Sequence, residues 1–437
     1  MSSSSNGPVP QQEARRDFTH GQLAGLSTYW AASNFIWGAL LTLIIARQVR
    51  LIVGVEGSAE VLGLVMMLLA IPAILVPLIV GPMSDRCLSR LGRRRPYILF
   101  GSCIAAVGLM AMWWAGEMRS IGWFAATLMV VNTGNNIATA AYSGVIPDLV
   151  GHGQRGLASG YMAVFSQAGT LFGVLISGYL VDNGYYLLCY AILASVQMLG
   201  LSVTMRAVHE TPLTERPPGK TFLAHLKSLW IDPRQYPDFG WVWLTRALVM
   251  LGFYSFLPFI LFYLTDVVQV KDPASTTGIV SGIVLLAAAV SGYFGGRISD
   301  VVGRKKIVMI ANALMAVICL GFAVVSTLTG VIVAAVLFGL AYGAYISVDW
   351  ALGADVLPNP DDAAKDMAVW HVAMTLPQAI AGYPAGALIA AFGIKSMQVG
   401  AVKVVHYTQA GYAALFVLCS VYLGLGAYLI RYVKGVN

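Results

Sequence analysis

The sequence predicts an all-α membrane protein with twelve transmembrane helices that form two six-helix pseudo-repeats. Hydrophobic residues make up 58% of the 437 residues and charged residues only 11%, whereas about a quarter of the residues of an ordinary soluble protein are charged. The apolar residues gather in runs that are long enough to cross a bilayer, and short polar loops separate these runs. Two of the loops also repeat one pattern at equivalent places in the two halves of the chain.

Twelve segments are long and apolar enough to span a membrane, for which an α-helix needs about 20 residues. They cover residues 23–46, 60–82, 96–116, 121–146, 156–181, 185–206, 239–264, 276–297, 306–326, 329–352, 366–391 and 408–431. The expected domains are an N-terminal tail at 1–22, a six-helix bundle at 23–206, a linker at 207–238, a second six-helix bundle at 239–431 and a C-terminal tail at 432–437. Inside the linker, residues 220–229 could form either an amphipathic surface helix or a plain connection.

The lysines and arginines predict the orientation of the chain. With an even number of spans both termini lie on one side, and the loops of that side hold twenty basic residues against six on the opposite side. Cytoplasmic loops are the more basic ones, so we expect cytoplasmic termini and a plasma or inner membrane. The net charge of +7 comes from these loops and not from a stripe of basic and aromatic residues. No nucleic-acid partner is therefore expected.

A pattern of glycine, aspartate and arginine occurs in two loops, each of which joins a second span to a third. The first loop reads Gly81-Pro-Met-Ser-Asp85 and then Gly92-Arg93-Arg94, and the second reads Gly296-Arg-Ile-Ser-Asp300 and then Gly303-Arg304. The positive-inside rule explains the arginines but not the repeated glycine and aspartate. Glycine allows a tight turn, and a carboxylate can hold an arginine or a helix end in one conformation. The pattern resembles the signature of the major facilitator superfamily, which implies a secondary transporter made of two repeats.

A second pair of loops, after the fourth and the tenth span, supports the duplication. Asp148 in the first half aligns with Asp355 in the second. We therefore expect a gate at the cytoplasmic face, to which both loop pairs contribute. Its predicted residues are Asp85, Gly92, Arg93, Arg94, Asp148, Arg155, Asp300, Gly303, Arg304 and Asp355.

The first loop also carries a more specific resemblance. Residues 84–96 look like the loop of plant sucrose carriers and of their animal and bacterial relatives among the glycoside-pentoside-hexuronide type of sugar:cation symporters, and the resemblance includes Asn135-Asn136 and residues 261–266. It implies proton-coupled sugar uptake. The plant carriers have an aspartate and an arginine where this chain has Asn132 and Ser143. Because a neutral amide does not titrate, the plant coupling mechanism does not carry over.

Polar stripes at helical spacing indicate a substrate pathway, because lipid-facing helices have little use for polar side chains. In the major facilitator fold, spans 1, 4, 7 and 10 face the central cavity. The predicted substrate-binding residues are Asn34, Trp37, Asn132, Asn135, Asn136, Thr139, Tyr142, Gln167, Arg246, Tyr254, Tyr342 and Tyr345. Amides and hydroxyls beside aromatic rings suit a sugar, and they suit other neutral polar metabolites as well. The alternative for each asparagine is a hydrogen bond between helices.

Two charges inside apolar segments are candidates for coupling. Arg246 in span 7 and Asp349 in span 10 lie at similar depths, and an unpaired charge at mid-membrane costs at least about 2.5–3.5 kcal/mol. We therefore expect them to pair, either as a titratable carboxylate released from its arginine or as a static ion pair. His371 in span 11 could relay a proton or could pack between helices.

The leading functional hypothesis is alternating-access symport of a sugar or a similar small polar metabolite with a proton. Its expected partners are this substrate, the proton and membrane lipid, and we expect a monomer without cofactor or metal. Two alternatives remain, an exporter of amphipathic compounds and a non-transporting receptor or pigment assembly factor on the same fold. The sequence holds no nucleotide-binding loop, metal cluster or nucleophile arrangement that would indicate an enzyme.

Overall fold

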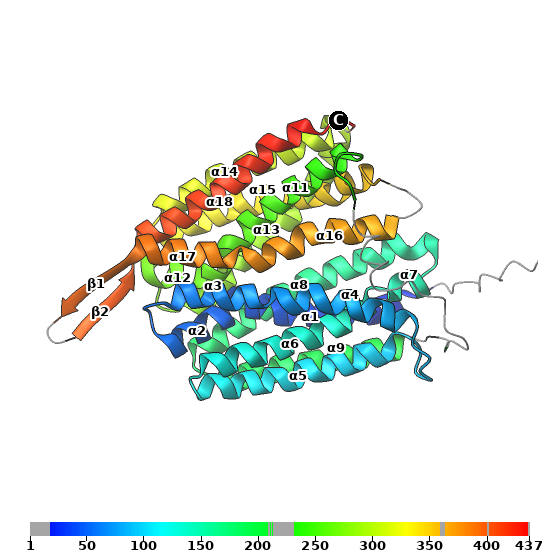
Figure 1. Ribbon diagram of the computed structural model, residues 1–437, viewed down its shortest axis with the longest axis horizontal. Helices are drawn as coiled ribbons and strands as arrows, with labels where there is room; N and C mark the ends of the chain where they lie inside the picture. Colours follow the sequence, from blue (N-terminus) through cyan, green and yellow to red (C-terminus); the bar gives the residue numbers. More distant parts are fainter. Residues whose placement is uncertain are drawn as a thin grey trace, which may run out of the picture.

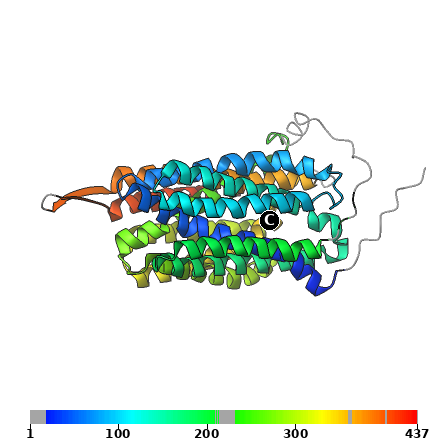
Figure 2. The same cartoon turned by 90° about the horizontal axis from the view of Figure 1, so that it is seen from below.

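The computed structural model describes residues 18–208, 210, 212, 231–358, 363–399 and 402–435. Long helices run side by side along its length, and a two-stranded hairpin projects from one end (Figure 1). We call this the hairpin end. The C-terminus and the loop between α4 and α5 lie at the opposite end, which we call the basic end (Figures 1 and 2).

The first half contains six spans. They are α1 (His20–Ala39) with η1 (Leu40–Ile44) and α2 (Ile45–Val53), then α3 (Ser58–Leu68) with α4 (Ala70–Asp85), then α5 (Arg95–Glu117), α6 (Ile121–Tyr142), α8 (Arg155–Asp182) and α9 (Tyr186–Ala207). Two short helices, α7 (Val145–Leu149) and η2 (His152–Gln154), connect α6 to α8. The fourth helix therefore ends near residue 142 and not at the predicted residue 146.

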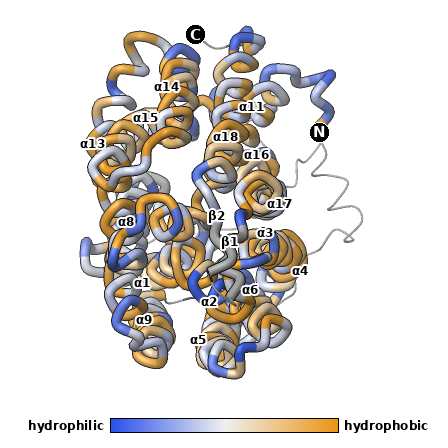
Figure 3. Tube along the Cα trace, turned by 90° about the vertical axis from the view of Figure 1, so that its left-hand side faces the viewer, coloured by the Kyte–Doolittle hydropathy of each residue, from blue (hydrophilic) through white to orange (hydrophobic). Residues whose placement is uncertain are grey.

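The second half repeats this plan. Its spans are α11 (Pro237–Phe256) with η3 (Leu257–Phe259), α12 (Ile260–Tyr263) and η4 (Leu264–Val268), then α13 (Pro273–Val302), α14 (Arg304–Val324), α15 (Leu328–Asp355), α16 (Ala363–Ile380) with α17 (Gly382–Gly393), and α18 (Gln409–Leu429) with η6 (Ile430–Tyr432). Seen along the helices, the two halves form two groups with many apolar residues on their outer surfaces (Figure 3). The predicted fold class of two six-helix repeats is confirmed. Residues 220–229 lie outside the described residues.

Eleven helical segments among the described residues are both long and apolar enough to cross a membrane. The twelfth span, α6, has 22 residues but falls short in hydropathy because Asn132, Asn135 and Asn136 interrupt its apolar sequence. A bilayer contains no water to satisfy such amides, so they need partners inside the protein. The polar face of α6 therefore lies within the bundle, where Asn132 and Asn135 are buried.

A short antiparallel hairpin is an addition to the predicted all-helical fold. Strand β1 (Ile394–Val399) pairs with β2 (Val402–Tyr407), and Ile394 lies opposite Tyr407. The hairpin connects α17 to α18. Its last residue is fully buried, and the Tyr407 hydroxyl accepts the backbone N–H of Ala59 in the first half at 3.2 Å. The base of the hairpin is thereby attached to both halves.

The halves pack closely toward the hairpin end. Helix α8 lies against α13, and α3 lies against α17. A Cβ atom on Gly178 would lie only 2.6 Å from the carbonyl oxygen of Ala274 in the other half, so this contact needs a glycine. Asp182 accepts the backbone N–H groups of Ala274 (3.1 Å) and Ser275 (2.7 Å). A carboxylate at a helix N-terminus is favourable, so Asp182 fastens α13 to the first half.

Spans 1 and 7 lose regular α-helical winding where they meet. Segment η1 is a π-helix, and it contacts the 3₁₀ segment η3, which contains Pro258. A second π-helical turn, η4, extends span 7 beyond its predicted end at residue 264. Departures of this kind are frequent at functional sites. The extension has the consequence that Asp266 lies within the helix and not in a loop.

Candidate functional site

The loop pattern of the first half forms a compact ion-pair network. The guanidinium of Arg94 donates to Asp148 at 2.9 Å and to the Ser84 hydroxyl at 3.1 Å, and it lies 2.6 Å from Asp85. Arg93 also pairs with Asp148, at 2.6 Å. The network connects the end of α4 to α7, and the Arg94 side chain is only 9% exposed. Asp85, Arg93, Arg94 and Asp148, four of the predicted gating residues of this half, are thus brought together.

A glutamate of the linker, Glu210, completes this network and is not among the predicted gating residues. The Glu210 carboxylate accepts the backbone N–H groups of Arg94 (2.9 Å) and Arg95 (3.3 Å) at the start of α5. Gly92 adopts φ +100°, and a Cβ atom there would lie 2.7 Å from the Cβ of Glu210. The glycine therefore supplies both the left-handed turn and the space for the glutamate. No local pattern indicates a contact between residues so distant in sequence.

The second half repeats the network in part. Arg304 forms an ion pair with Asp355 and donates to the Ala351 carbonyl at 3.3 Å. Gly303 has φ +104°, as expected for the counterpart of Gly92. The side chain of Asp300 lies outside the described part of the chain. Arg155 begins α8 and donates to the Val150 carbonyl at 3.4 Å.

The predicted pair of Arg246 and Asp349 is brought together and buried. Their side chains form an ion pair and are 1% and 3% exposed. The Tyr345 hydroxyl donates to Asp349 at 2.8 Å, and the guanidinium lies over the Trp370 ring at 4.8 Å and the Trp350 ring at 5.5 Å. All of these contacts lie within the second half. The ion pair can therefore form or break without separating the two halves.

The asparagines of α6 divide into two groups. Asn132 donates to the Leu69 carbonyl at 2.7 Å, at the junction of α3 and α4, and Asn135 accepts the Ser33 hydroxyl at 2.9 Å. These amides connect helices. Asn136 donates only within its own helix, to Asn132 at 2.7–2.8 Å, and its side-chain oxygen Oδ1 has no hydrogen-bond partner among the described residues. Asn34 similarly donates to the Trp30 carbonyl at 2.8 Å.

The remaining predicted substrate residues occupy different surroundings. Tyr142 is buried, donates to the Leu26 carbonyl at 2.6 Å and stacks on Trp30, while Thr139 donates to the Asn135 carbonyl of its own helix at 2.8 Å. Trp37 is half-buried, and its indole N–H is buried without a partner in the described ranges.

In the second half, the Tyr342 ring stacks on the Phe253 ring with centroids 4.8 Å apart. Tyr254 packs edge-on against the Phe253 ring. These aromatic residues come from spans 7 and 10. Gln167 and His371 are exposed. The exposure of His371 is compatible with the predicted proton relay, and packing between helices stays the alternative.

An ion pair between the halves, at the hairpin end, was not predicted. Arg50 of α2 donates to Asp266 of η4 at 3.0 Å, and the Tyr412 hydroxyl donates to the same carboxylate at 2.5 Å. The side chains of Arg50 and Asp266 are 13% and 4% exposed, and the guanidinium lies 5.0 Å from the centroid of the Phe262 ring. The signal for Arg50 was its place among the few cations of the predicted outer side.

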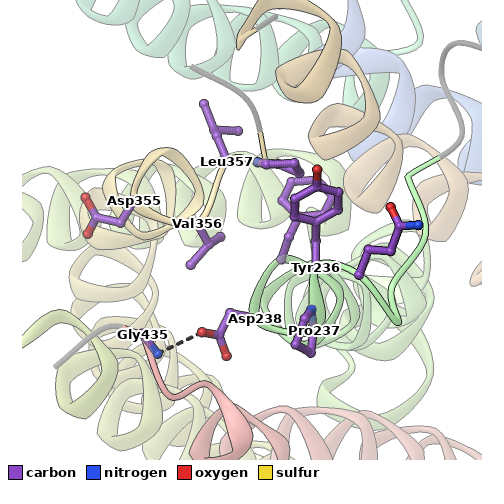
Figure 4. A pocket seen from close by; sticks show the side chains of 10 residues that line it. Tyr236, Pro237, Asp238, Asp355, Val356, Leu357 and Gly435 are labelled. Carbon is purple, nitrogen blue, oxygen red and sulfur yellow. Dashed lines mark hydrogen bonds between the residues drawn. The ribbon is translucent and has the colours of Figure 1, made fainter. Parts of the chain in front are cut away.

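A surface pocket at the basic end lies in the second half. Tyr236, Asp238, Asp355 and Leu357 line it together with Gly435 (Figure 4). Asp238 accepts the backbone N–H groups of Lys434 (2.9 Å) and Gly435 (2.8 Å), which holds the C-terminal segment against the start of α11. Apart from Asp355, none of the predicted substrate, coupling or gating residues lines this pocket. We therefore do not assign the substrate to it.

Replacing Asp85 with Ala should slow transport and leave substrate affinity within a few fold. Asp85 is half-exposed and contacts Arg94, so its loss weakens the network without touching the predicted substrate residues. Turnover and half-saturation measured in proteoliposomes would separate these effects. The control is Glu117→Ala, which removes an exposed carboxylate at the hairpin end. Reduced affinity with unchanged turnover would contradict a gating role.

Comparison with known proteins agrees with this architecture. The sequence model of the Major Facilitator Superfamily matches residues 23–272 and again residues 270–434. The sucrose transport protein SUC4 of Arabidopsis thaliana is 26% identical over 226 residues, a region that covers 42% of this chain and 43% of that protein.

Two solved structures share the fold. The nucleoside transporter NupG is similar with a TM-score of 0.71 at 12% identity, covering 94% of this chain and 99% of that chain. A bacterial homologue of the human lysosomal transporter Spinster, in an inward-facing and unoccupied conformation, is similar with a TM-score of 0.66 at 15% identity, covering 94% and 95% of the two chains.

Proposed function

Because the chain belongs to the major facilitator superfamily, a family of membrane transporters and not of enzymes, we propose that it moves a sugar or a similar neutral polar metabolite by alternating access, coupled to a proton. The observation that carries this proposal is a set of polar groups in spans 1 and 4 that make no hydrogen bond to another helix among the described residues and lie beside aromatic rings. The similarity to a sucrose transport protein supports a sugar among the neutral metabolites.

We assign substrate contact to Asn34, Asn136 and Trp37. The hydrogen bond between Ser33 and Asn135 places α1 and α6 side by side, so the neighbouring residues Asn34 and Asn136 lie at the same level of the bundle. Their amide oxygens can accept sugar hydroxyls. The buried indole N–H of Trp37 has no acceptor among the described residues, and such a group is costly unless a ligand or water satisfies it.

The gating cycle that we propose is a rocking of the two halves about the substrate. The halves are joined at the hairpin end by Arg50–Asp266 and by Asp182 at the start of α13, whereas the ion pairs Arg94–Asp148 and Arg304–Asp355 each lie within one half. With the basic end assigned to the cytoplasm by its cations, this arrangement corresponds to closure toward the outside. The proton would bind at Asp349.

Uptake into proteoliposomes tests the proposal. Purified protein would be offered radiolabelled sucrose, maltose, glucose, uridine and a lipophilic cation, each with and without an inward pH gradient. Accumulation of a sugar or nucleoside that depends on the gradient supports proton-coupled transport of a neutral metabolite. Movement of the lipophilic cation alone would support the exporter hypothesis, and no transport in either direction would support a receptor.

Replacing Asn136 with Ala should weaken substrate binding about tenfold, the effect of losing one good hydrogen bond, and leave thermal stability almost unchanged. The matched variant is Asn132→Ala, which removes the hydrogen bond to Leu69 and should lower the melting temperature. Binding measured by calorimetry and unfolding measured by fluorescence would distinguish the two. Unchanged affinity in Asn136→Ala would remove this residue from the substrate site.

A further inference from the structure

A groove runs between the ends of α14 and α18 at the basic end, away from the predicted pathway. Its lining includes Lys305, Lys306, Arg431 and Lys434, together with the apolar side chains of Val302 and Met309. No acidic residue is among the described residues that line it. The groove therefore combines a positive rim with an apolar wall.

The positive charge of the groove is not neutralised within the described ranges. Lys305 donates to the backbone carbonyls of Arg431 (2.9 Å) and Val433 (2.5 Å), which shapes the rim and leaves its charge in place. Lys306 and Lys434 are exposed. The nearby carboxylate of Asp238 binds the backbone N–H groups of Lys434 and Gly435 and lines the separate pocket of Figure 4.

The apolar side of the groove continues onto the outer surface of the bundle. Val302 and Met309 are 42% and 38% exposed, and Tyr428 on α18 is 51% exposed. The guanidinium of Arg431 lies over the Tyr428 ring, and Trp241 stacks on Tyr432 with centroids 5.0 Å apart. Tyrosine and tryptophan are typical of the membrane–water interface. The groove thus offers cations next to aromatic residues of the kind found at that interface, and an apolar wall beside them.

We propose that this groove binds the headgroup of an anionic phospholipid of the adjacent leaflet. The phosphate would lie between Lys306 and Lys434, and an acyl chain would follow Met309 and Tyr428 along α14 and α18. Basic pockets at helix ends on the cytoplasmic side are suited to such headgroups. Because Lys305 and Lys306 directly follow Arg304, a bound lipid would steady the start of α14, where the Arg304–Asp355 pair is formed.

Native mass spectrometry of the detergent-solubilised protein tests this inference. The probes are phosphatidylglycerol, phosphatidylcholine with the same acyl chains, glycerol 3-phosphate and inorganic phosphate. We expect selective binding of phosphatidylglycerol, which Lys306→Gln combined with Lys434→Gln should weaken about thirtyfold, as expected for two basic residues next to an anionic lipid. Replacing the same lysines with Arg should preserve binding, which separates lost charge from misfolding.

The matched control is Arg90→Gln combined with Arg297→Gln, which removes two exposed cations from the same end outside the groove. If this control weakens phosphatidylglycerol binding as much as the lysine variant does, the proposal is overturned in favour of attraction by diffuse surface charge. Binding of inorganic phosphate or glycerol 3-phosphate as tight as that of the lipid would overturn it in favour of a soluble anion. These outcomes do not depend on which substrate is transported.

Discussion

The Asp349→Asn protein should lose concentrative uptake under a pH gradient and keep downhill exchange of substrate. Asparagine preserves the size of the side chain and can still accept the Tyr345 hydroxyl, but it does not titrate. The arginine partner remains supported by the rings of Trp370 and Trp350, because cation–π contacts strengthen when desolvated. Accumulation and counterflow measured in the same proteoliposomes would separate the two activities.

Two further variants make the Asp349 experiment decisive. Asp349→Glu retains a titratable carboxylate and should keep part of the concentrative uptake. Arg246→Ala should damage both uptake and exchange, because removal of one partner of a buried ion pair costs about 3–5 kcal/mol by leaving the other charge unpaired. If Asp349→Asn still accumulates substrate against its gradient, the coupling site lies elsewhere, and His371 is the next residue to replace.

The sequence predicts the spans and the repeat well because both depend on local information. Hydropathy and length identify membrane helices directly, and the repeated glycine, aspartate and arginine mark equivalent loops. The pairing of Arg246 with Asp349 also follows from a physical constraint, since two opposite charges at similar depth gain by meeting. The structure places these two side chains in contact.

Other parts of the site depend on three-dimensional geometry that no periodic pattern in the sequence indicates. The π-helical turn η4 continues span 7 and carries Asp266 into the bundle, two residues beyond the end at residue 264 that hydropathy predicts. The contact of Glu210 with the start of α5 joins residues that are far apart in sequence. The amides of Asn132 and Asn136 are similar in sequence context, and the carbonyl of Leu69 at the interruption of span 2 gives Asn132 a partner on another helix.

Replacing Asp266 with Ala should open the hairpin end. The substitution leaves Arg50 largely buried without its carboxylate and also removes the acceptor of Tyr412. An unpaired buried charge costs about 3–5 kcal/mol, which is enough to shift the balance between closed and open states by more than about a hundredfold. Uptake should fall steeply, because the carrier would remain open to the predicted outside.

The measurement is the reactivity of a cysteine introduced at Ala59, a residue that is fully buried between the halves beside Tyr407. In a background without Cys87 and Cys103, this cysteine should resist a membrane-impermeant maleimide while Asp266 is present and react rapidly in the Asp266→Ala protein. Glu117→Ala, which removes an exposed carboxylate at the same end, is the control and should stay protected. If the cysteine stays protected in Asp266→Ala as well, the closure rests on Asp182 and the packed glycines, and the Arg50–Asp266 pair is not a gate.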